Sequence, residues 1–279
     1  MLSAKYDVTI AYRIYPRVSK SPFIHPDSKL KLTEAGIRTI RQSLGKVRAK
    51  FLFLLDNCPT EYTSMILNYF SPEDIIFFNY KRIGNLATFG KQIDLLLGQT
   101  HSEIVMFAED DYVYRPHELA KAVALLKNHQ SIDFVTPYDH LDSYLLPVHT
   151  RHRYEIISAE GLHWRTSAST CLTFLTTKTI LRGTEKAFRS YCNGNWDSSL
   201  WFSLTKFNVL SLPSLPVFLR DGFIFKIILK SWLHNPFQIL FGRKYKLWQP
   251  LPSIATHMEK ISLAPGIDWT KVVSESEKN

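Results

Sequence analysis

Three consecutive carboxylates, Glu109, Asp110 and Asp111, follow directly on the short apolar run Ile104 to Ala108. A run of this length with β-branched and aromatic residues is typical of a strand buried on both faces. Ligands bind at the carboxyl ends of strands in open α/β sheets, where clustered carboxylates can hold a divalent cation. The same triplet could equally open a solvated turn or cap the following helix.

Three further groups could take part in chemistry, and each has a structural alternative. Asp56 ends a second apolar run, KFLFLL, and could instead cap a helix that begins at Thr60. Asp197 stands at the start of the apolar segment SSLWFSL, where a helix cap is the alternative role. His257 is one of ten histidines in the chain, and a single histidine more often has a structural role.

The elements that would position these groups alternate between strand and helix over the first half. Pro and Gly punctuation separates them, and Asp27 or Ser28 could cap the first helix. Repeated β-α-β units predict a mostly parallel sheet with right-handed crossovers. Strands are expected over 6–15, 50–55, 74–78 and 104–108, and helices over 28–44, from 60, from 85 and over 116–129.

The pattern changes beyond Ile132. The stretch 154–181 reads as an antiparallel pair of strands that leads into a short helix, and 193–204 reads as a turn and a helix with Asp197 near its start. No internal repeat or low-complexity linker interrupts the chain. We therefore expect one domain over 1–272 with a nucleotide-binding half (1–130), an acceptor half (131–215) and a C-terminal segment (216–272), followed by a disordered tail (273–279).

The composition limits the class of protein. With 45% hydrophobic and 21% charged residues the chain is ordinary for a globular protein, and its net charge of +9 favours phosphate-rich partners. The three cysteines have no CxxC spacing, which argues against a disulfide framework or a zinc site and for a reducing compartment. The sequence shows neither a secretory leader nor a run of about 18 apolar residues. We expect a cytoplasmic protein.

The segment 223–248 alternates apolar and aromatic residues with lysine and arginine. This pattern is typical of an amphipathic helix that lies at a membrane surface, which would place the protein at the inner face of a membrane. A core helix and loop with a solvated basic face is the alternative. Nucleic acid is not expected as a partner, because the sequence has neither an RNP-type motif nor a GxxG loop.

The order of these motifs resembles that of GT-A fold glycosyltransferases, closest to the inverting family 2. The resemblance covers roughly residues 6 to 269 and rests on IAYRIYPR, FLLDN, RIGNLATFGKQIDLLL, IVMFAEDD, TCLTFLTTKTIL, NWDSSLWFSL and ATHMEKISLAPGIDW. It implies an α/β, Rossmann-like, mostly parallel sheet flanked by helices, with a mixed second half on the acceptor side. It also implies a nucleotide-diphosphate sugar as donor and Mn²⁺ or Mg²⁺ as cofactor.

The resemblance assigns the carboxylate triplet to the DxD motif, which grips the donor ribose and, through the metal, the diphosphate. Asp111 is the expected metal ligand, Glu109 is expected to lie toward the ribose and to share the metal, and Asp110 is expected to help bind the donor. The family usually has Asp at the first position, so Glu109 is a departure. A metal suits this reaction because a departing nucleoside diphosphate gains negative charge that a Lewis acid neutralises.

Five residues are matched to the rest of the donor site. Tyr12 and Arg13 follow the first strand where the base is accommodated, and Asp56 matches the acid that contacts the nucleoside. Asn85 and Lys91 lie where the third loop approaches the base and the phosphates, with loop or surface roles as the alternatives.

The resemblance assigns proton transfer to Asp197, the catalytic base of an inverting transfer, beside Trp196 as an aromatic wall for a sugar acceptor. His257 matches a C-terminal histidine that serves as a further metal ligand in some members. Arg243 and Lys244 could contact the diphosphate or face a membrane.

The sequence therefore predicts a metal-dependent glycosyltransferase that moves a sugar to a glycan or lipid-linked hydroxyl, with inversion. A nucleotidyltransferase of related fold is the first alternative, although IAYRIYPR has no glycine for its loop. A glycan- or membrane-binding relative without turnover is the second.

Overall fold

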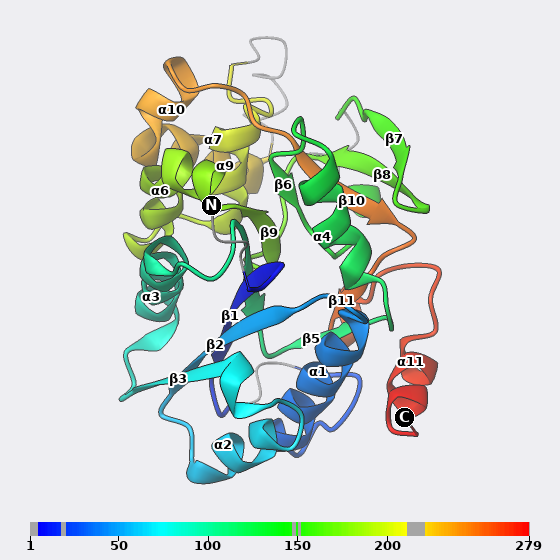
Figure 1. Cartoon of the computed structure of the whole chain (residues 1–279). Helices are drawn as coiled ribbons and strands as arrows, with labels where there is room; N and C mark the ends of the chain where they lie inside the picture. The colour runs from blue at the N-terminus through cyan, green and yellow to red at the C-terminus, as the bar shows by residue number, and fades with distance from the viewer. Residues whose placement is uncertain (1–4, 18–20, 147–148, 150–151, 211–220, 279) are drawn as a thin grey trace.

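The computed structural model describes residues 5–17, 21–146, 149, 152–210 and 221–278 (Figure 1). A nine-stranded sheet in the order β3-β2-β1-β4-β9-β6-β10-β8-β7 forms its centre, and helices cover both faces. The strands are β1 (Val8–Ile14), β2 (Ala49–Asp56), β3 (Ile75–Tyr80), β4 (Ile104–Glu109), β5 (Tyr112–Tyr114), β6 (Phe134–Val135), β7 (Ile156–Ala159), β8 (Leu162–Ser167), β9 (Phe174–Thr177), β10 (Leu247–Leu251) and β11 (Ala255–His257). The α-helices are α1 (Lys29–Ser43), α2 (Thr60–Leu67), α3 (Gly84–Gly98), α4 (Leu119–Asn128), α5 (Asp142–Leu145), α6 (Lys178–Cys192), α7 (Asp197–Thr205), α9 (Gly222–His234), α10 (Pro236–Leu240) and α11 (Trp269–Ser276), with 3-10 turns η1 (Pro72–Asp74) and η3 (Lys260–Ser262).

The first half has the predicted parallel arrangement. Strands β3, β2, β1 and β4 are all parallel, and helices α1, α2 and α3 connect them. Ser28 caps α1, since its side chain accepts a hydrogen bond from the backbone N–H of Lys31. The expected α/β class, with a largely parallel sheet flanked by helices, is therefore confirmed, and the carboxyl ends of β1, β2 and β4 meet at one edge.

The alternation of side chains along β1 decides which residues face which helices. Val8, Ile10, Tyr12 and Ile14 belong to the apolar core that also includes residues of α1, α2 and α4. Ala11 belongs to the opposite core, formed with α3, α6 and α7. Because neighbouring strand residues point to opposite faces, Tyr12 and Arg13 cannot serve the same side of the sheet.

The second half of the sheet is mixed, as expected. Strand β9 runs antiparallel between β4 and β6, and β7 and β8 form the predicted antiparallel pair. The helix after β9 is α6, whose 15 residues make it longer than the predicted short helix. The C-terminal part of the chain then returns to the sheet as β10, parallel to β6 and antiparallel to β8.

A small two-stranded sheet brings the C-terminal segment to the end of β4. Strand β11 pairs antiparallel with β5, so that His257 lies opposite Tyr112, one residue after the carboxylate triplet. The backbone N–H of Met258 donates to the carbonyl of Asp111 over 2.7 Å and extends this pairing. Residues almost 150 positions apart in sequence are thus held side by side.

The segment from 273 onward was expected to be disordered, but it is helical as far as Ser276. Asp268 caps α11 by accepting from the N–H of Lys271, and Val273 is buried. The helix packs on α1, where Arg38 Nε donates to Ser276 Oγ over 3.1 Å and Gln42 donates to the Ser276 carbonyl. The polar composition of the tail concealed this contact, because only one side of the helix is apolar.

The segment 223–248 is not one amphipathic helix. It forms α9 and α10, and its last two residues enter the sheet as the start of β10. None of the helices in the described part of the chain is both long enough and apolar enough to cross a membrane.

Candidate active site

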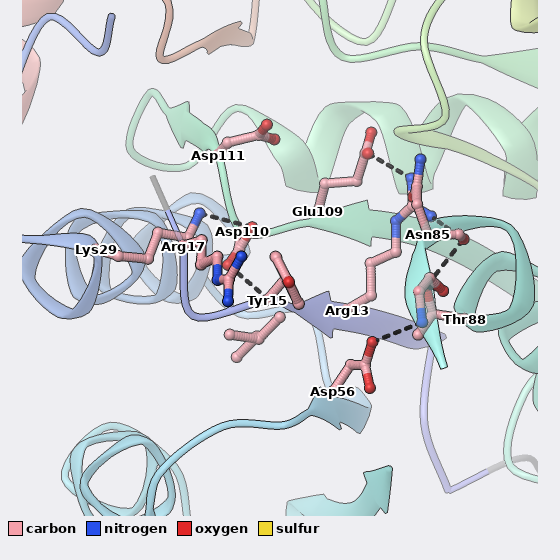
Figure 2. A pocket seen from close by; sticks show the side chains of 12 residues that line it. Arg13, Tyr15, Arg17, Lys29, Asp56, Asn85, Thr88, Glu109, Asp110 and Asp111 are labelled. Carbon is pink, nitrogen blue, oxygen red and sulfur yellow. Dashed lines mark hydrogen bonds and ion pairs between the residues drawn. The ribbon is translucent and has the colours of Figure 1, made fainter. Parts of the chain in front are cut away.

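A cavity of about 420 Å³ lies at the carboxyl edge of the parallel strands (Figure 2). Its walls come from the ends of β1, β2 and β4, from the start of α3 and from the N-terminus of α1. The residues that line it are Arg13, Ile14, Tyr15, Arg17, Lys29, Asp56, Gly84, Asn85, Thr88, Glu109, Asp110 and Asp111. Basic and acidic groups therefore face the same space, as a polyanion with a bound cation would require.

Glu109, the last residue of β4, is held by two partners. Its carboxylate accepts from the guanidinium of Arg13 over 2.5 Å and from the hydroxyl of Thr173 over 3.2 Å. Arg13 is buried, and it also donates to the backbone carbonyl of Asn85. The Glu109 carboxylate is thus oriented by a charge-assisted hydrogen bond.

Asp110 turns toward the N-terminus of α1. One carboxylate oxygen lies 3.0 Å from Nζ of Lys29, and the other accepts from the backbone N–H of Tyr15 and the hydroxyl of Thr33. Burial raises the pKa of Asp110, an effect that Lys29 partly offsets and the neighbouring Asp111 increases. With its oxygens occupied in this way, Asp110 ties β4 to α1 and to the loop after β1.

Asp111 lies apart from Glu109 and Asp110 (Figure 2). Its carboxylate meets His257. Its Oδ2 is 3.1 Å from His257 Nε2, and each side chain is about one-fifth exposed, at 21%. Burial alone would raise the pKa of Asp111, but the charge and hydrogen bond of His257, with help from Lys29 and Arg13, lower it to about 2. Burial alone would lower the pKa of His257, yet Asp111 raises it above its ordinary value. The two groups stabilise each other's charge.

The pair Asp111 and His257 has the donor atoms for a divalent cation. Asp111 Oδ1 is buried and has no hydrogen-bond partner among the described residues. Nowhere in the described ranges do three or more His, Cys, Asp or Glu residues form a complete metal cage. Mg²⁺ sites commonly use one or two carboxylates together with substrate phosphates and water. Glu109, expected to be a third ligand, is instead held by Arg13 and Thr173.

Asp56 lies at the end of β2 and contacts the start of α3. Its two carboxylate oxygens accept from the backbone N–H groups of Ile83 and Gly84, each over 2.9 Å. The sequence alternative, in which Asp56 caps the helix that begins at Thr60, is therefore wrong. Asp56 accepts from backbone N–H groups at the start of α3 instead. Gly84 has a φ of +83°, a left-handed value that favours glycine and lets its N–H reach Asp56.

Asn85 lies at the cavity wall one residue later. Its side-chain amide donates to the hydroxyl of Tyr191 on α6 over 3.0 Å, and its carbonyl accepts from Arg13. Thr88, on the next turn of α3, donates to the carbonyls of Gly84 and Asn85. The start of α3 is thus fixed to both neighbouring strands by hydrogen bonds.

A second cavity of about 140 Å³ contains Asp197. Burial raises the pKa of Asp197; the N–H of Ser198 opposes this rise and the charge of Glu109 adds to it. Asp197 is the first residue of α7 and accepts from the N–H of Ser198 over 2.7 Å. The cavity is lined by His140, Asp142, Ser143, Leu146, His149, Ser169, Thr170, Cys171, Asp197, Ser198, Phe202, Phe223 and Ile227.

Most titratable groups around Asp197 are held neutral by burial. Burial lowers the pKa of His140, and it lowers that of His149 to about 4. Burial also raises the pKa of the Cys171 thiol, with further contributions from Asp197 and Glu109. Cys171 therefore stays a thiol near neutral pH and is a poor nucleophile. A carboxylate with a raised pKa among neutral neighbours is suited to accept a proton.

One short segment connects the two cavities. Thr173 contacts Glu109 in the first cavity, while Thr170 and Cys171 line the second. The charge of Glu109 also reaches Asp197 and raises its pKa. Residues 170–173 therefore link the wall of the second cavity to Glu109 in the first.

Four residues expected at the donor site lie elsewhere. Tyr12 is fully buried in the core on the α1 side, because it has the opposite strand parity to Arg13. Lys91 is exposed on α3 and pairs with Asp94 at 3.7 Å. Arg243 forms an ion pair with Asp133 and stacks over Tyr245, and Lys244 follows it on the surface. None of the four lines the donor cavity that the described residues form.

Sequence reasoning missed several residues that the fold brings to the two cavities. Lys29 and Arg17 supply positive charge to the first cavity, and His140 and Cys171 line the second. The signal for Lys29 was its place directly after the predicted cap Ser28, since the N-terminus of a helix favours anions. No local pattern marked His140 or Cys171.

Neither a family model nor a curated protein matches this chain. Among solved structures it is similar to residues 1–349 of TarS from Staphylococcus aureus, with 13% identity, 70% of this chain covered and a TM-score of 0.44. The chain spans 55% of that structure.

Two further similar solved structures are sugar transferases by name. The galactosyltransferase LgtC, solved with donor and acceptor sugar analogues, matches at 9% identity over 70% of this chain and 69% of its own, with a TM-score of 0.42. The mannosyltransferase PcManGT of Pyrobaculum calidifontis, solved with GDP-Man and Mn²⁺, matches at 15% identity over 85% and 73%, with a TM-score of 0.44. At these values the likeness carries no functional argument by itself, and the contacts described above have to supply it.

Proposed function

We propose that this chain is a metal-dependent glycosyltransferase, which transfers a sugar from a nucleotide-diphosphate sugar to an acceptor hydroxyl with inversion. The observation that carries the proposal is the pairing of two different cavities at one strand end. The first presents Arg17, Lys29 and Asp111, whose carboxylate pairs with His257, and the second presents Asp197 with a raised pKa. The negatively charged leaving group needs the cations of the first cavity. The acceptor hydroxyl, which gives up a proton, needs the carboxylate of the second.

The first cavity fits the nucleoside diphosphate. Its volume of about 420 Å³ is within the range of small-ligand sites. Arg17 and Lys29 supply positive charge for phosphate oxygens, while Asp56 and Asn85 contribute polar groups at the α3 side, where the nucleoside would lie. Arg13 and Thr173 orient Glu109, and each of its oxygens keeps a further lone pair that can accept from a ribose hydroxyl.

Asp111 and His257 would hold the divalent cation, with His257 in its neutral form, so that binding of the metal would displace the proton His257 shares with Asp111. Bound there, Mn²⁺ or Mg²⁺ would act as a Lewis acid that neutralises the charge growing on the diphosphate. Asp111 brings a lowered pKa and an unpartnered buried oxygen, so it is ready as an anionic ligand. Asp110 acts indirectly, since its contacts to Lys29 and Tyr15 set the position of the next residue.

Asp197 would act as the base. As the acceptor oxygen attacks the anomeric carbon, its proton passes to Asp197, and the bond between that carbon and the phosphate oxygen breaks. The nucleoside diphosphate leaves with the bonding electron pair. The raised pKa strengthens Asp197 as a proton acceptor at neutral pH. Trp196, expected as an aromatic wall for the sugar, packs against Phe223 and Lys230 and is not among the described residues that line this cavity.

A screen of sugar nucleotides tests the proposal. The purified chain is incubated with UDP-, GDP-, ADP- and dTDP-sugars with and without Mn²⁺, and thermal shift and release of nucleoside diphosphate are measured. We expect one donor to stabilise the chain and to be consumed only with metal. Release of pyrophosphate instead would identify a nucleotidyltransferase. Failure of every donor to stabilise or react, with Asp111→Ala identical to the parent chain, would overturn the proposal.

A further inference from the structure

Helices α9 and α10 and the residue that follows α10 carry seven exposed large apolar side chains, here called the α9–α10 face. Every strongly exposed phenylalanine in the described part of the chain lies on it, and Phe237 and Phe241 are 78% and 80% exposed. Large apolar side chains that cluster on a protein surface often mark an interaction site, whereas single scattered ones do not. Its apolar members are Phe223, Phe225, Leu229, Leu233, Phe237, Leu240 and Phe241.

The face is built into the helix and is not an accident of fraying. On α9, Ile224, Ile227 and Ser231 are buried. Phe225, Leu229 and Leu233 recur every four residues and form a separate exposed stripe. A helix that is apolar on both its packed side and its outer side has a second apolar surface to bury.

Along the segment that builds the face the charged side chains are all cations, of which Arg243 pairs with Asp133 and Lys246 with Glu155. From residue 222 to residue 246 the sequence contains Lys226, Lys230, Arg243, Lys244 and Lys246, and no acidic residue. Lys226 and Lys244 are exposed. The surface therefore combines insertable aromatic side chains with cations, as an interfacial membrane-binding helix does.

A cavity beside the face extends the basic character. It measures about 500 Å³ and lies between α6 and α10, with Arg182, Lys186 and His234 in its wall next to Phe237. Glu185 also lines it and is paired with Arg189. Arg182 and Lys186 are both exposed. Phosphate head groups are the matching partners for such a cluster.

We propose that the α9–α10 face binds the surface of a membrane that contains anionic lipids. The phenylalanine and leucine side chains enter the boundary between head groups and acyl chains, and the lysine and arginine side chains stay at the level of the phosphates. Charge complementarity selects an anionic lipid surface over a second copy of this chain, because two such faces would repel each other.

This orientation has a consequence for the acceptor that rests on the proposed function. Phe223 and Ile227 of α9 form part of the wall of the cavity that contains Asp197. A face seated on a membrane holds that cavity at the lipid surface, so an acceptor sugar anchored to a lipid can reach the base. The binding itself does not depend on any transfer activity.

Vesicle sedimentation tests the proposal without a sugar nucleotide. The chain is mixed with phosphatidylcholine vesicles and with vesicles that also contain phosphatidylglycerol. We expect binding to the mixed vesicles and weak binding to the neutral ones. The variant Phe237→Ser/Phe241→Ser should bind the mixed vesicles about tenfold more weakly, or worse, because it loses two inserted rings. Lys226→Glu/Lys244→Glu should lose about as much.

A matched control removes exposed apolar groups elsewhere. Ile261→Ser/Leu67→Ser alters side chains that are 79% and 46% exposed outside the face, and it should bind vesicles like the parent chain. The proposal is overturned if the parent chain does not bind the mixed vesicles, or if the phenylalanine variant and the control behave alike. Dimerisation through the face without vesicle binding, measured by sedimentation velocity, also overturns it. If the parent chain binds the mixed vesicles but consumes no sugar nucleotide, the result counts against the proposed function and not against membrane binding.

Discussion

The two cavities at the end of β4 have opposite electrostatic character. In the donor-side cavity each carboxylate of the triplet meets a cation, Arg13, Lys29 or His257, so charge is retained by pairing. In the acceptor-side cavity the histidines lose their charge through burial. Paired charges can be rearranged around a polyanion, whereas neutral groups form hydrogen bonds to hydroxyls without competing for a cation. Under the proposed function, this difference matches the diphosphate to the first cavity and the acceptor hydroxyl to the second.

The largest expected effect comes from the base on the acceptor side. Asp197→Asn should lower the turnover of the preferred sugar nucleotide about 1000-fold, because it removes proton transfer. The affinity for the nucleoside diphosphate, measured by calorimetry, should stay unchanged. Asp142→Asn, in the same cavity, is the control and should keep most of the activity. If Asp197→Asn weakens nucleotide binding instead, the division between the two cavities fails.

Removing the metal ligand should affect the donor side in the opposite manner. Asp111→Asn should weaken binding of the nucleoside diphosphate about 10- to 100-fold in the presence of Mn²⁺ and leave metal-free binding nearly unchanged. Calorimetric titrations with Mn²⁺ and with chelator measure both values. Asp142→Asn should retain the full effect of Mn²⁺. An equal loss with and without Mn²⁺ would mean that Asp111 contacts the nucleotide directly.

The neutral histidines should make the acceptor side sensitive to acid. The pKa of His149 is lowered to about 4 by burial, against an ordinary value of 6.5, with His140, His152 and Arg165 opposing its charge and Asp142 favouring it. The unfolded chain therefore binds a proton first as the pH falls below 6.5. The free energy of unfolding should drop by about 1–2 kcal/mol from this residue between pH 6.5 and about pH 5.

Substitution of His149 isolates its share of that acid sensitivity. His149→Gln should flatten the loss of unfolding free energy measured by urea denaturation over the same pH range. The exposed His163, substituted in the same way, should leave the slope as it is in the parent chain. An unchanged slope in His149→Gln would show that this residue is not held neutral.

The smallest expected effect comes from comparing Arg17, which the structure places in the donor cavity, with Lys91, which the sequence motif had assigned there. Arg17→Gln should raise the KM for the sugar nucleotide about fivefold through loss of one phosphate contact, with kcat little changed. Lys91→Gln should have no effect, because Lys91 is exposed on α3 and pairs with Asp94. Initial-rate kinetics measure both. The reverse result would restore the role that the sequence motif assigned to Lys91.

Local patterns predicted much of the first half of the fold. Apolar runs ending in Asp56 and in Glu109 became β2 and β4, because a buried strand leaves its signature in consecutive residues. Asp197 also begins the expected helix. These predictions needed only the sequence within a few residues.

Contacts between distant elements were beyond such patterns. Tyr12 was expected to contact the nucleotide base of the donor because it belongs to the predicted first strand. The side of the sheet that Tyr12 faces, however, depends on where α1 packs. Lys29 reaches Asp110 only because α1 crosses the end of β4. The α11 helix was missed because its apolar side becomes evident only against α1.

The pairing of β5 with β11 imposes a rule on how this site can change during evolution. His257 lies opposite Tyr112 because of an exact antiparallel register. A one-residue insertion or deletion in β11 would move Thr256 or Met258 to that place and turn the histidine to the other face. Substitutions along β11 leave the register intact. The segment is therefore expected to tolerate replacement of its residues better than a change in its length. A natural relative with a gap here would need another residue for the role proposed for His257.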